Sequence, residues 1–172
     1  KATIKSNVVK YKKPLFYCNA IGSQTEIVFD GASLVFDKDA NLCGALPMFE
    51  SAMQMFECND DGTINAPILE PAASVPSKEL NPATLVPALN IDQVYKALVL
   101  GVKDYFNKMG FKKAILGSSG GIDSAVTLAI ACEALGKENV YAILMPSPYS
   151  TEHSVDDAVE LSKNLGNPYD TL

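Results

Sequence analysis

The sequence has 172 residues, and 48% of them are hydrophobic, which is enough to build a packed core and excludes disorder as the default. Its formal net charge of −6 argues against a nucleic-acid backbone as the main partner, because such binders usually concentrate Lys and Arg. No apolar run approaches the roughly 20 residues needed to cross a bilayer, so we expect a soluble protein without a membrane partner.

The cysteines and the single histidine leave little scope for metal or disulfide chemistry. Cys18, Cys43, Cys58 and Cys132 form no CxxC pair, and His153 has no cysteine at zinc-finger spacing. No signal-peptide pattern opens the chain, so we expect reduced thiols and a cytoplasmic location. Cys18 lies within an apolar β-type run, which indicates a buried structural thiol.

Residues 1–58 predict short antiparallel strands. Residues 1–11 are assigned as the tail of a helix or as a loop. Apolar β-type runs then follow, separated by turn formers such as Asp30-Gly31. These runs cover residues 15–18, 26–29, 33–36 and 42–43. Consecutive strands joined by such turns predict a small antiparallel meander.

Residues 59–90 predict a linker between two domains. They begin with Asn59-Asp60-Asp61-Gly62 and then contain prolines at positions 67, 71, 76, 82 and 87. Proline removes the amide donors that a regular hydrogen-bonded ladder needs. A segment of this length without regular structure is unusual inside one compact domain, so a domain boundary is expected here.

Residues 91–172 predict an α/β fold. Apolar residues recur at three- and four-residue steps over 91–109, which predicts a helix that ends at Gly110 and buries its apolar stripe in the core. The remaining predicted elements are a strand at 114–116, a helix from about 123 to 135, a strand at 140–144, and a helix from about 154 to 165. This alternation is expected of a doubly wound parallel sheet.

The loop between the strand at 114–116 and the next helix has the composition of a phosphate-binding turn. It reads Gly117-Ser118-Ser119-Gly120-Gly121-Ile122-Asp123-Ser124. Backbone amides at a helix N-terminus bind anions, and glycines let an anion approach the backbone closely. Ser119 and Ser124 add hydroxyl donors. Together these residues predict a cradle for a phosphate or pyrophosphate.

Asp123 separates this loop from two common nucleotide-binding motifs. A Walker A loop needs a Lys where Asp123 stands, and the GxGxxG spacing is absent. A carboxylate beside a phosphate cradle fits a bridging Mg²⁺, which binds one or two carboxylates together with phosphate oxygens. We therefore predict Asp123 as the metal ligand. The alternative is a Gly-rich turn in which Asp123 and Ser124 only cap the helix.

Residues 119–124, Ser-Gly-Gly-Ile-Asp-Ser, resemble the pyrophosphate loop of the N-type ATP pyrophosphatases, which include the NAD, GMP and asparagine synthetases. The stretch Met-Pro-Ser-Pro-Tyr-Ser-Thr-Glu at 145–152 is similar to the NAD synthetase branch. There this segment lines the adenine pocket, which implies that Met145 and Thr151 lie near the nucleotide. A core position for Met145 remains open, because Met fills gaps well.

The first part of the chain points to the same family independently. Residues 17–22 and 26–33 are similar to the late strands of a nitrilase-type glutaminase domain, an α-β-β-α sandwich. Glutamine-dependent NAD synthetases place such a domain ahead of the pyrophosphatase domain. The resemblance therefore implies that residues 1–58 belong to the C-terminal portion of the glutaminase domain and residues 91–172 to the N-terminal portion of the NAD synthetase domain.

The resemblance implies a ligase that adenylates nicotinic acid adenine dinucleotide with ATP, releases pyrophosphate, and amidates the intermediate with ammonia from glutamine. Ser119 is expected to act in catalysis by stabilising the pyrophosphate leaving group together with Mg²⁺. The alternatives are another PP-loop amidotransferase or thiolation enzyme, and a non-catalytic ATP-binding module.

The chain also departs from the family pattern. The glutaminase Glu, Lys and Cys of the family precede the region similar to residues 17–22, so Cys18 is not the glutaminase nucleophile. The resemblance implies a chain truncated at both ends, which we expect to be inactive alone, and a full-length homo-oligomer. Ser118 stands where many relatives have an apolar residue.

Overall fold

The computed structural model describes residues 2–65, 91–146 and 152–172. The chain divides into two compact units, the first formed by residues 1–22 and 27–89 and the second by residues 23–26 and 90–172. No helix in the described ranges is both long and apolar enough to span a membrane.

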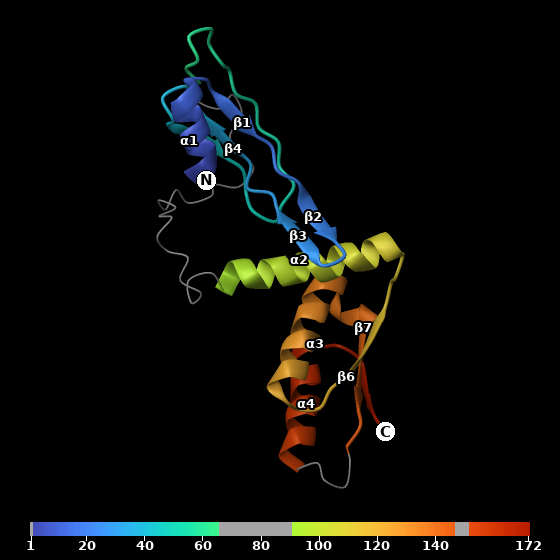
Figure 1. Ribbon diagram of the computed structural model, residues 1–172. Coiled ribbons are helices and arrows are strands. Elements are labelled where there is room, and N and C mark those ends of the chain that lie inside the picture. Colours follow the sequence, from blue (N-terminus) through green and yellow to red (C-terminus); the bar gives the residue numbers. More distant parts are fainter. Residues whose placement is uncertain (1, 66–90, 147–151) are drawn as a thin grey trace. The chain divides into compact units, whose positions relative to one another are not determined.

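The first unit combines a helix with short antiparallel strands (Figure 1). β1 pairs with β4 and β4 pairs with β5, whereas β2 and β3 form a separate two-stranded sheet. The expected meander is therefore confirmed for β4 and β5 and wrong for β1, which pairs with β4, and it also lacked β2. The elements are α1 (Ala2–Tyr11), β1 (Leu15–Tyr17), β2 (Ile21–Gln24), β3 (Ile27–Asp30), β4 (Leu34–Phe36) and β5 (Leu42–Ala45).

The side chain of Asn19 explains how β1 reaches β4. Its Nδ2 donates hydrogen bonds to Asp30 Oδ1 at 2.8 Å and to the carbonyl of Gly31 at 2.7 Å. Its backbone N–H donates to Ser33 Oγ at 3.0 Å. These bonds close the base of the excursion that contains β2 and β3, so the strands on either side of it meet. A polar side chain, rather than the apolar pattern, sets this pairing.

The core of the first unit lies between α1 and the three-stranded sheet. Val8 of α1 packs with Leu34 and Phe36 of β4 and with Ala40, and all four are buried. Cys18 follows β1 and is exposed, so the predicted buried thiol is wrong. Phe16 and Tyr17 of the same run are exposed as well, so the apolar composition of the run did not decide its burial.

Residues 59–65 form a hydrogen-bonded turn. The N–H of Asn59 donates to the carbonyl of Thr63 at 2.9 Å, and Cys58 and Ile64 form an antiparallel bridge. The N–H of Lys38 donates to the carbonyl of Gly62 at 3.1 Å, which ties this turn to the segment after β4. Residues 66–90 of the predicted linker lie outside the described residues.

The second unit is a parallel α/β structure, as predicted. Its sheet has the order β6-β7-β8, and both pairs of neighbouring strands are parallel. The short strand β8 was not predicted. The elements are α2 (Ile91–Met109), β6 (Ala114–Gly117), α3 (Ile122–Leu135), the 3-10 helix η2 (Lys137–Asn139), β7 (Val140–Leu144), α4 (Glu152–Leu165) and β8 (Tyr169–Thr171).

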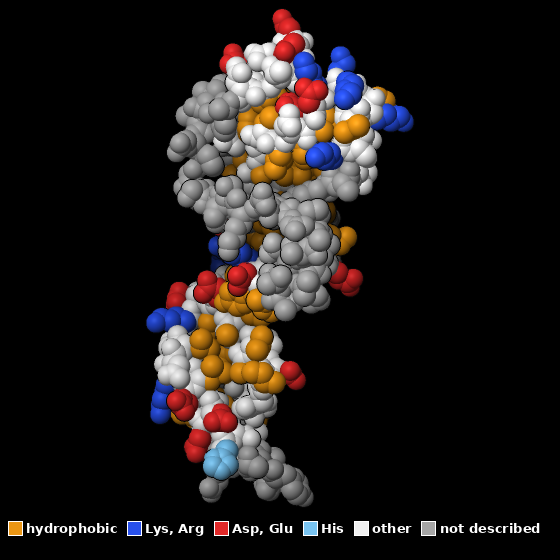
Figure 2. All heavy atoms as spheres, turned by 90° about the vertical axis from the view of Figure 1, so that its left-hand side faces the viewer, with side chains coloured by type: hydrophobic (Ala, Val, Ile, Leu, Met, Phe, Trp, Pro, Cys, Tyr) orange, Lys and Arg blue, Asp and Glu red, His pale blue; other side chains and the backbone are white. Residues whose placement is uncertain are grey.

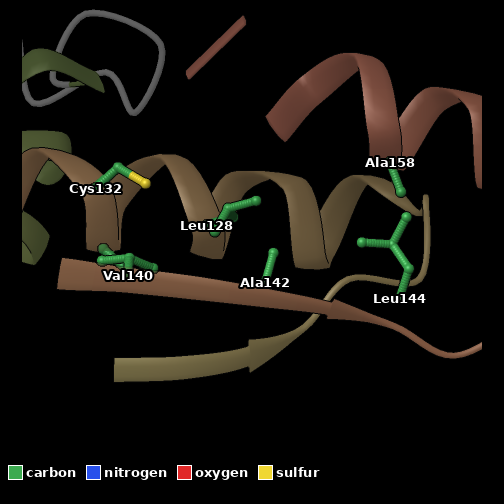
Figure 3. Close-up of a cluster of buried hydrophobic side chains, with 7 residues drawn as sticks. Leu128, Cys132, Val140, Ala142, Leu144 and Ala158 are labelled. Carbon is green, nitrogen blue, oxygen red and sulfur yellow. The ribbon is translucent and has the colours of Figure 1, made fainter. Parts of the chain in front are cut away.

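The core of the second unit lies where α3 and α4 pack on one face of the sheet (Figure 3). Alternate residues of β7 point to this face, and they are the buried ones, as the two-residue period of a strand requires. Each large apolar side chain removed from water here contributes about 1.5–3 kcal/mol. The buried members are Leu128, Ala131, Cys132, Val140, Ala142, Leu144 and Ala158.

The apolar stripe of α2 is not core in the described structure. None of its residues is fully buried, and Val94 and Leu98 are about half exposed, so the prediction of a buried stripe is wrong. Apolar side chains reach the surface elsewhere in both units as well (Figure 2). The periodicity predicted the helix correctly but not how much of its apolar face is covered.

Candidate phosphate-binding site

The predicted cradle lies at the carboxyl edge of the parallel sheet. β6 ends at Gly117 and α3 begins at Ile122, so four loop residues connect the strand to the helix. Ligands of parallel α/β sheets bind outside this edge. The first turn of α3 also presents N–H groups that have no acceptor within the helix. Position and polarity therefore both suit an anion.

Two serine hydroxyls and the loop backbone form one hydrogen-bonded turn. The N–H of Ser119 donates to Ser124 Oγ at 3.2 Å, and the two Oγ atoms lie 3.1 Å apart. Ser124 Oγ also donates to the carbonyl of Gly121 at 2.9 Å, and the N–H of Gly121 donates to Ser119 Oγ at 3.3 Å. The longer of these bonds are weak and exchangeable for bonds to a ligand. The structure thus brings Ser119 and Ser124 together.

The helix-capping alternative concerns the hydrogen bonds at the start of α3. Gly121 occupies the N-cap position of α3, and no side chain caps the helix there. Ser124 instead bonds to Ser119 and Gly121. The backbone carbonyl of Asp123 accepts a hydrogen bond from Thr127 Oγ1 at 2.8 Å.

Ser118 points into the protein rather than toward the open side of the loop. Ser118 is 5% exposed, and its N–H donates to the carbonyl of Ile143 on β7 at 2.9 Å. Its Oγ is buried and has no hydrogen-bond partner in the described structure. Ser118 therefore anchors the start of the loop through its backbone, while Ser119 is exposed.

Met145 lies beside the first residue of the cradle. A Cβ placed on Gly117 would be 3.3 Å from Met145 Cε, so the two residues are neighbours at the ends of β6 and β7. Met145 is 64% exposed, and the core alternative for it is wrong. Thr151, the other residue expected near the nucleotide, lies outside the described residues.

Asp123 stands on the first turn of α3 and is exposed, as is the neighbouring Ile122. It helps to line an apolar pocket of about 660 Å³ between α2, β6 and α3 that was not expected from the sequence. The apolar stripe of α2 was the available signal, because Leu98, Val102 and Phe106 line this pocket.

A magnesium ion at Asp123 would have one protein carboxylate. Among the described residues, no three His, Cys, Asp or Glu side chains converge as a metal site. This donor set fits Mg²⁺ bound through one carboxylate, phosphate oxygens and water, and it does not fit an all-protein cage.

Comparison with known proteins identifies the family. The family model for NAD synthase matches residues 94–172. The chain is 40% identical over 171 residues to a glutamine-dependent NAD(+) synthetase of Synechocystis sp.. The aligned residues make up 98% of this chain and 28% of that protein. The chain belongs to the glutamine-dependent NAD(+) synthetase family. Its relative in Rhodobacter capsulatus is 41% identical over 160 residues, covering 92% of this chain and 27% of that synthetase.

A solved glutamine-dependent NAD(+) synthetase supports the fold over the whole chain. The structure from Acinetobacter baumannii, described in complex with ADP, superposes with a TM-score of 0.80 at 31% identity. The match covers 98% of this chain and 30% of the synthetase. The chain thus spans less than a third of the length of these relatives.

Proposed function

We propose that the chain is part of an NAD(+) synthetase in which residues 117–124 hold the phosphates of ATP. The observation that carries the proposal is the turn formed by Ser119, Gly121 and Ser124 at the carboxyl edge of the parallel sheet. The bound ADP named for the Acinetobacter baumannii relative supports a nucleotide ligand. The acceptor, nicotinic acid adenine dinucleotide, follows from the family.

The proposed reaction has two steps. A carboxylate oxygen of the dinucleotide attacks the α-phosphorus of ATP, the bond from that phosphorus to the bridging oxygen breaks, and pyrophosphate leaves. Ammonia then attacks the acyl carbon, AMP leaves, and loss of a proton gives the amide of NAD(+). Negative charge grows on pyrophosphate in the first step, so preoriented donors at that position accelerate it.

The loop residues supply these donors. The hydroxyl of Ser119 and the N–H groups at the start of α3 would bind the leaving pyrophosphate, and the N–H of Gly121 would exchange its bond to Ser119 Oγ for one to the ligand. Asp123 would hold Mg²⁺, which would neutralise charge at the phosphates. The attacking carboxylate is already ionised, so this step needs no general base. Gly117 and Met145, which are neighbours at the ends of β6 and β7, would lie near the adenine, and we propose the same role for Thr151.

We also propose the arrangement of the longer protein from its family. Residues 1–58 would belong to a nitrilase-like glutaminase domain that releases ammonia from glutamine, residues 59–90 to a linker, and residues 91–172 to the synthetase domain. A cytoplasmic homo-oligomer is the expected form. The chain without the remaining sequence would be inactive.

Exchange between ATP and labelled pyrophosphate tests the first step in the full-length protein. Exchange is expected with nicotinic acid adenine dinucleotide but not with xanthosine monophosphate or aspartate. Exchange supported by either of the other acceptors would identify a different PP-loop amidotransferase. ATP binding without exchange for any acceptor would identify a non-catalytic module.

Asp123→Ala is the variant that tests the loop itself. Loss of the proposed metal ligand should lower the exchange rate on the order of 100-fold, comparable to removing one transition-state donor. Glu133→Ala changes an exposed carboxylate on the same helix and is the matched control, with exchange expected to stay at the wild-type rate. Equal exchange in both variants would remove Asp123 from the mechanism.

A further inference from the structure

Gly120 makes a contact that phosphate binding does not explain. Its φ is +79°, and a Cβ built on it would lie 2.7 Å from the carbonyl carbon of Ser154 and 2.9 Å from its Cα. These are backbone atoms in the first turn of α4, and they cannot rotate away as the end of a flexible side chain can. Gly120 therefore packs directly against α4 with no room for a methyl group.

Two other glycines show that this contact is specific. Gly121 has a φ of −82°, and a Cβ on it would meet only Ser119 Oγ, at 3.4 Å. Gly110 has a φ of +74° but nothing within 4 Å of an added Cβ. Gly110 thus requires glycine for its backbone conformation alone, whereas Gly120 requires it for conformation and for the close approach of α4.

The amino end of α4 is held in place by the core. Ala158 lies one turn after Ser154, is 1% exposed, and packs with Leu128 of α3 and Leu144 of β7 (Figure 3). Close packing of this kind resists displacement, because neighbouring atoms leave no space to move into. The core therefore holds α4 one turn away from the surface that meets Gly120.

The loop has three anchors, each on a different element. Ser118 bonds to Ile143 of β7, and Ser119 bonds to Ser124 of α3. Gly120 rests against Ser154 of α4. The first two anchors are hydrogen bonds that a ligand can replace or lengthen. The third is steric, so it sets how far the loop can move toward α4.

We infer that the backbone of α4 at Ser154 positions the loop amides for the ATP phosphates, through its contact with Gly120. This inference rests on the proposed function of the loop. Anion binding needs several N–H groups aligned on one ligand. A methyl group added at Gly120 would push the loop away from α4 and would therefore weaken binding of the phosphates. Binding couplings are reciprocal, so a phosphate ligand also steadies the first turn of α4.

Binding of inorganic pyrophosphate with Mg²⁺ tests the inference in the full-length protein. Gly120→Ala should weaken its binding on the order of 100-fold, the cost of a misplacement near 1 Å at a positioned site. The affinity for AMP is expected to change far less. Gly110→Ala is the matched control for the backbone conformation, and both affinities should remain at the wild-type values. Equal pyrophosphate affinity in Gly120→Ala and wild type would overturn the inference.

Hydrogen exchange in the wild type supplies a second readout, which does not depend on whether a variant folds. In the wild type, pyrophosphate should slow exchange at the amides of the first two turns of α4, from His153 to Ala158, and leave the amides of α2 unchanged. In Gly120→Ala without ligand, the same α4 amides should exchange faster. Unchanged α4 exchange in the wild type with pyrophosphate bound would overturn the inference.

Ser119→Ala separates this inference from the proposed function. If pyrophosphate binds the wild type and Ser119→Ala weakens it, the loop is the phosphate site. Absence of an α4 response would then contradict the positioning role alone. If pyrophosphate does not bind the wild type, or binds equally to Ser119→Ala, the proposed function of the loop fails and the positioning role fails with it.

Discussion

The two compact units pair their strands in different ways. In the second unit, β6, β7 and β8 are neighbours in chain order and are parallel, with a helix packed across each connection. In the first unit, β1 passes over β2 and β3 to pair with β4. The parallel unit therefore joins strands that follow one another in the chain, whereas hydrogen bonds from Asn19 stabilise the pairing of more distant strands in the antiparallel unit.

The two units also differ in the size of their cores. Among the residues that the structure describes, seven buried ones form the core cluster of the second unit and four form that of the first. A larger cluster has fewer ways to relax around a lost side chain, because more of its neighbours are fixed by their own contacts. The same substitution should therefore cost more in the second unit.

Truncation of one core leucine in each unit makes this comparison quantitative. Leu128→Ala should lower the local free energy of unfolding by about 4–5 kcal/mol, and Leu34→Ala by about 3 kcal/mol, because the smaller core can partly collapse into the cavity. Amide exchange of β7 measures the first change, and amide exchange of β4 measures the second. Lys163→Ala on the exposed side of α4 should stay within about 0.5 kcal/mol of wild type. A larger loss for Leu34→Ala would reverse the ranking of the two cores.

The turn after β4 tests how far local hydrogen bonds stabilise the first unit. Asp37 Oδ1 accepts from the N–H groups of Asp39 and Asn41, each at 2.9 Å, and Oδ2 accepts from Asn41 Nδ2 at 2.8 Å. The side-chain bond from Asn41 is the main cause that lowers the pKa of Asp37, and the backbone N–H groups add to it. Asp37→Ala should destabilise the unit by about 1 kcal/mol.

The pH dependence of this contribution has a definite sign. Because folding lowers the pKa of Asp37, its ionised form stabilises the fold above the unfolded pKa of about 3.9. The contribution is lost as pH falls through the folded pKa. The difference in free energy of unfolding between wild type and Asp37→Ala should therefore shrink below about pH 4. Asp39→Ala, at an exposed position of the same turn, is the control. A difference that is constant from neutral pH to pH 2 would contradict the assignment.

The smallest expected effect concerns two strands of the parallel sheet. Tyr141 Oη on β7 donates to Asp170 Oδ2 on β8 at 2.6 Å. This hydrogen bond is the main cause that raises the pKa of Tyr141. Its stabilising effect is present below the unfolded pKa of about 10 and is lost as pH rises through the folded pKa. Asp170→Asn should move the pKa of Tyr141 down toward its ordinary value.

An NMR titration of the tyrosine Cζ signals measures this pKa. Tyr141→Phe removes one signal and thereby assigns it. An unchanged pKa of Tyr141 in Asp170→Asn would mean that the hydrogen bond does not persist in solution, and β8 would then be joined to β7 by its backbone pairing alone.

Several particulars could be predicted because their causes lie within short stretches of sequence. The three- and four-residue spacing of apolar residues predicted α2 and its end before Gly110. The Ser-Gly-Gly-Ile-Asp-Ser stretch lies between a strand and a helix, as expected. Strand β8 was missed because three residues are too few to show a period. The exposure of Cys18 and of the α2 stripe was missed because burial depends on what packs against a segment.

The amino-acid order alone specified the family, the succession of helices and strands in the second unit, and the place of the serines in the loop. Tertiary structure decided the partner of β1, the inward turn of Ser118 and the contact of Gly120 with Ser154. The first group depends on interactions between residues a few positions apart, which a pattern records. The second depends on segments that are distant in the chain and meet only when the core has packed.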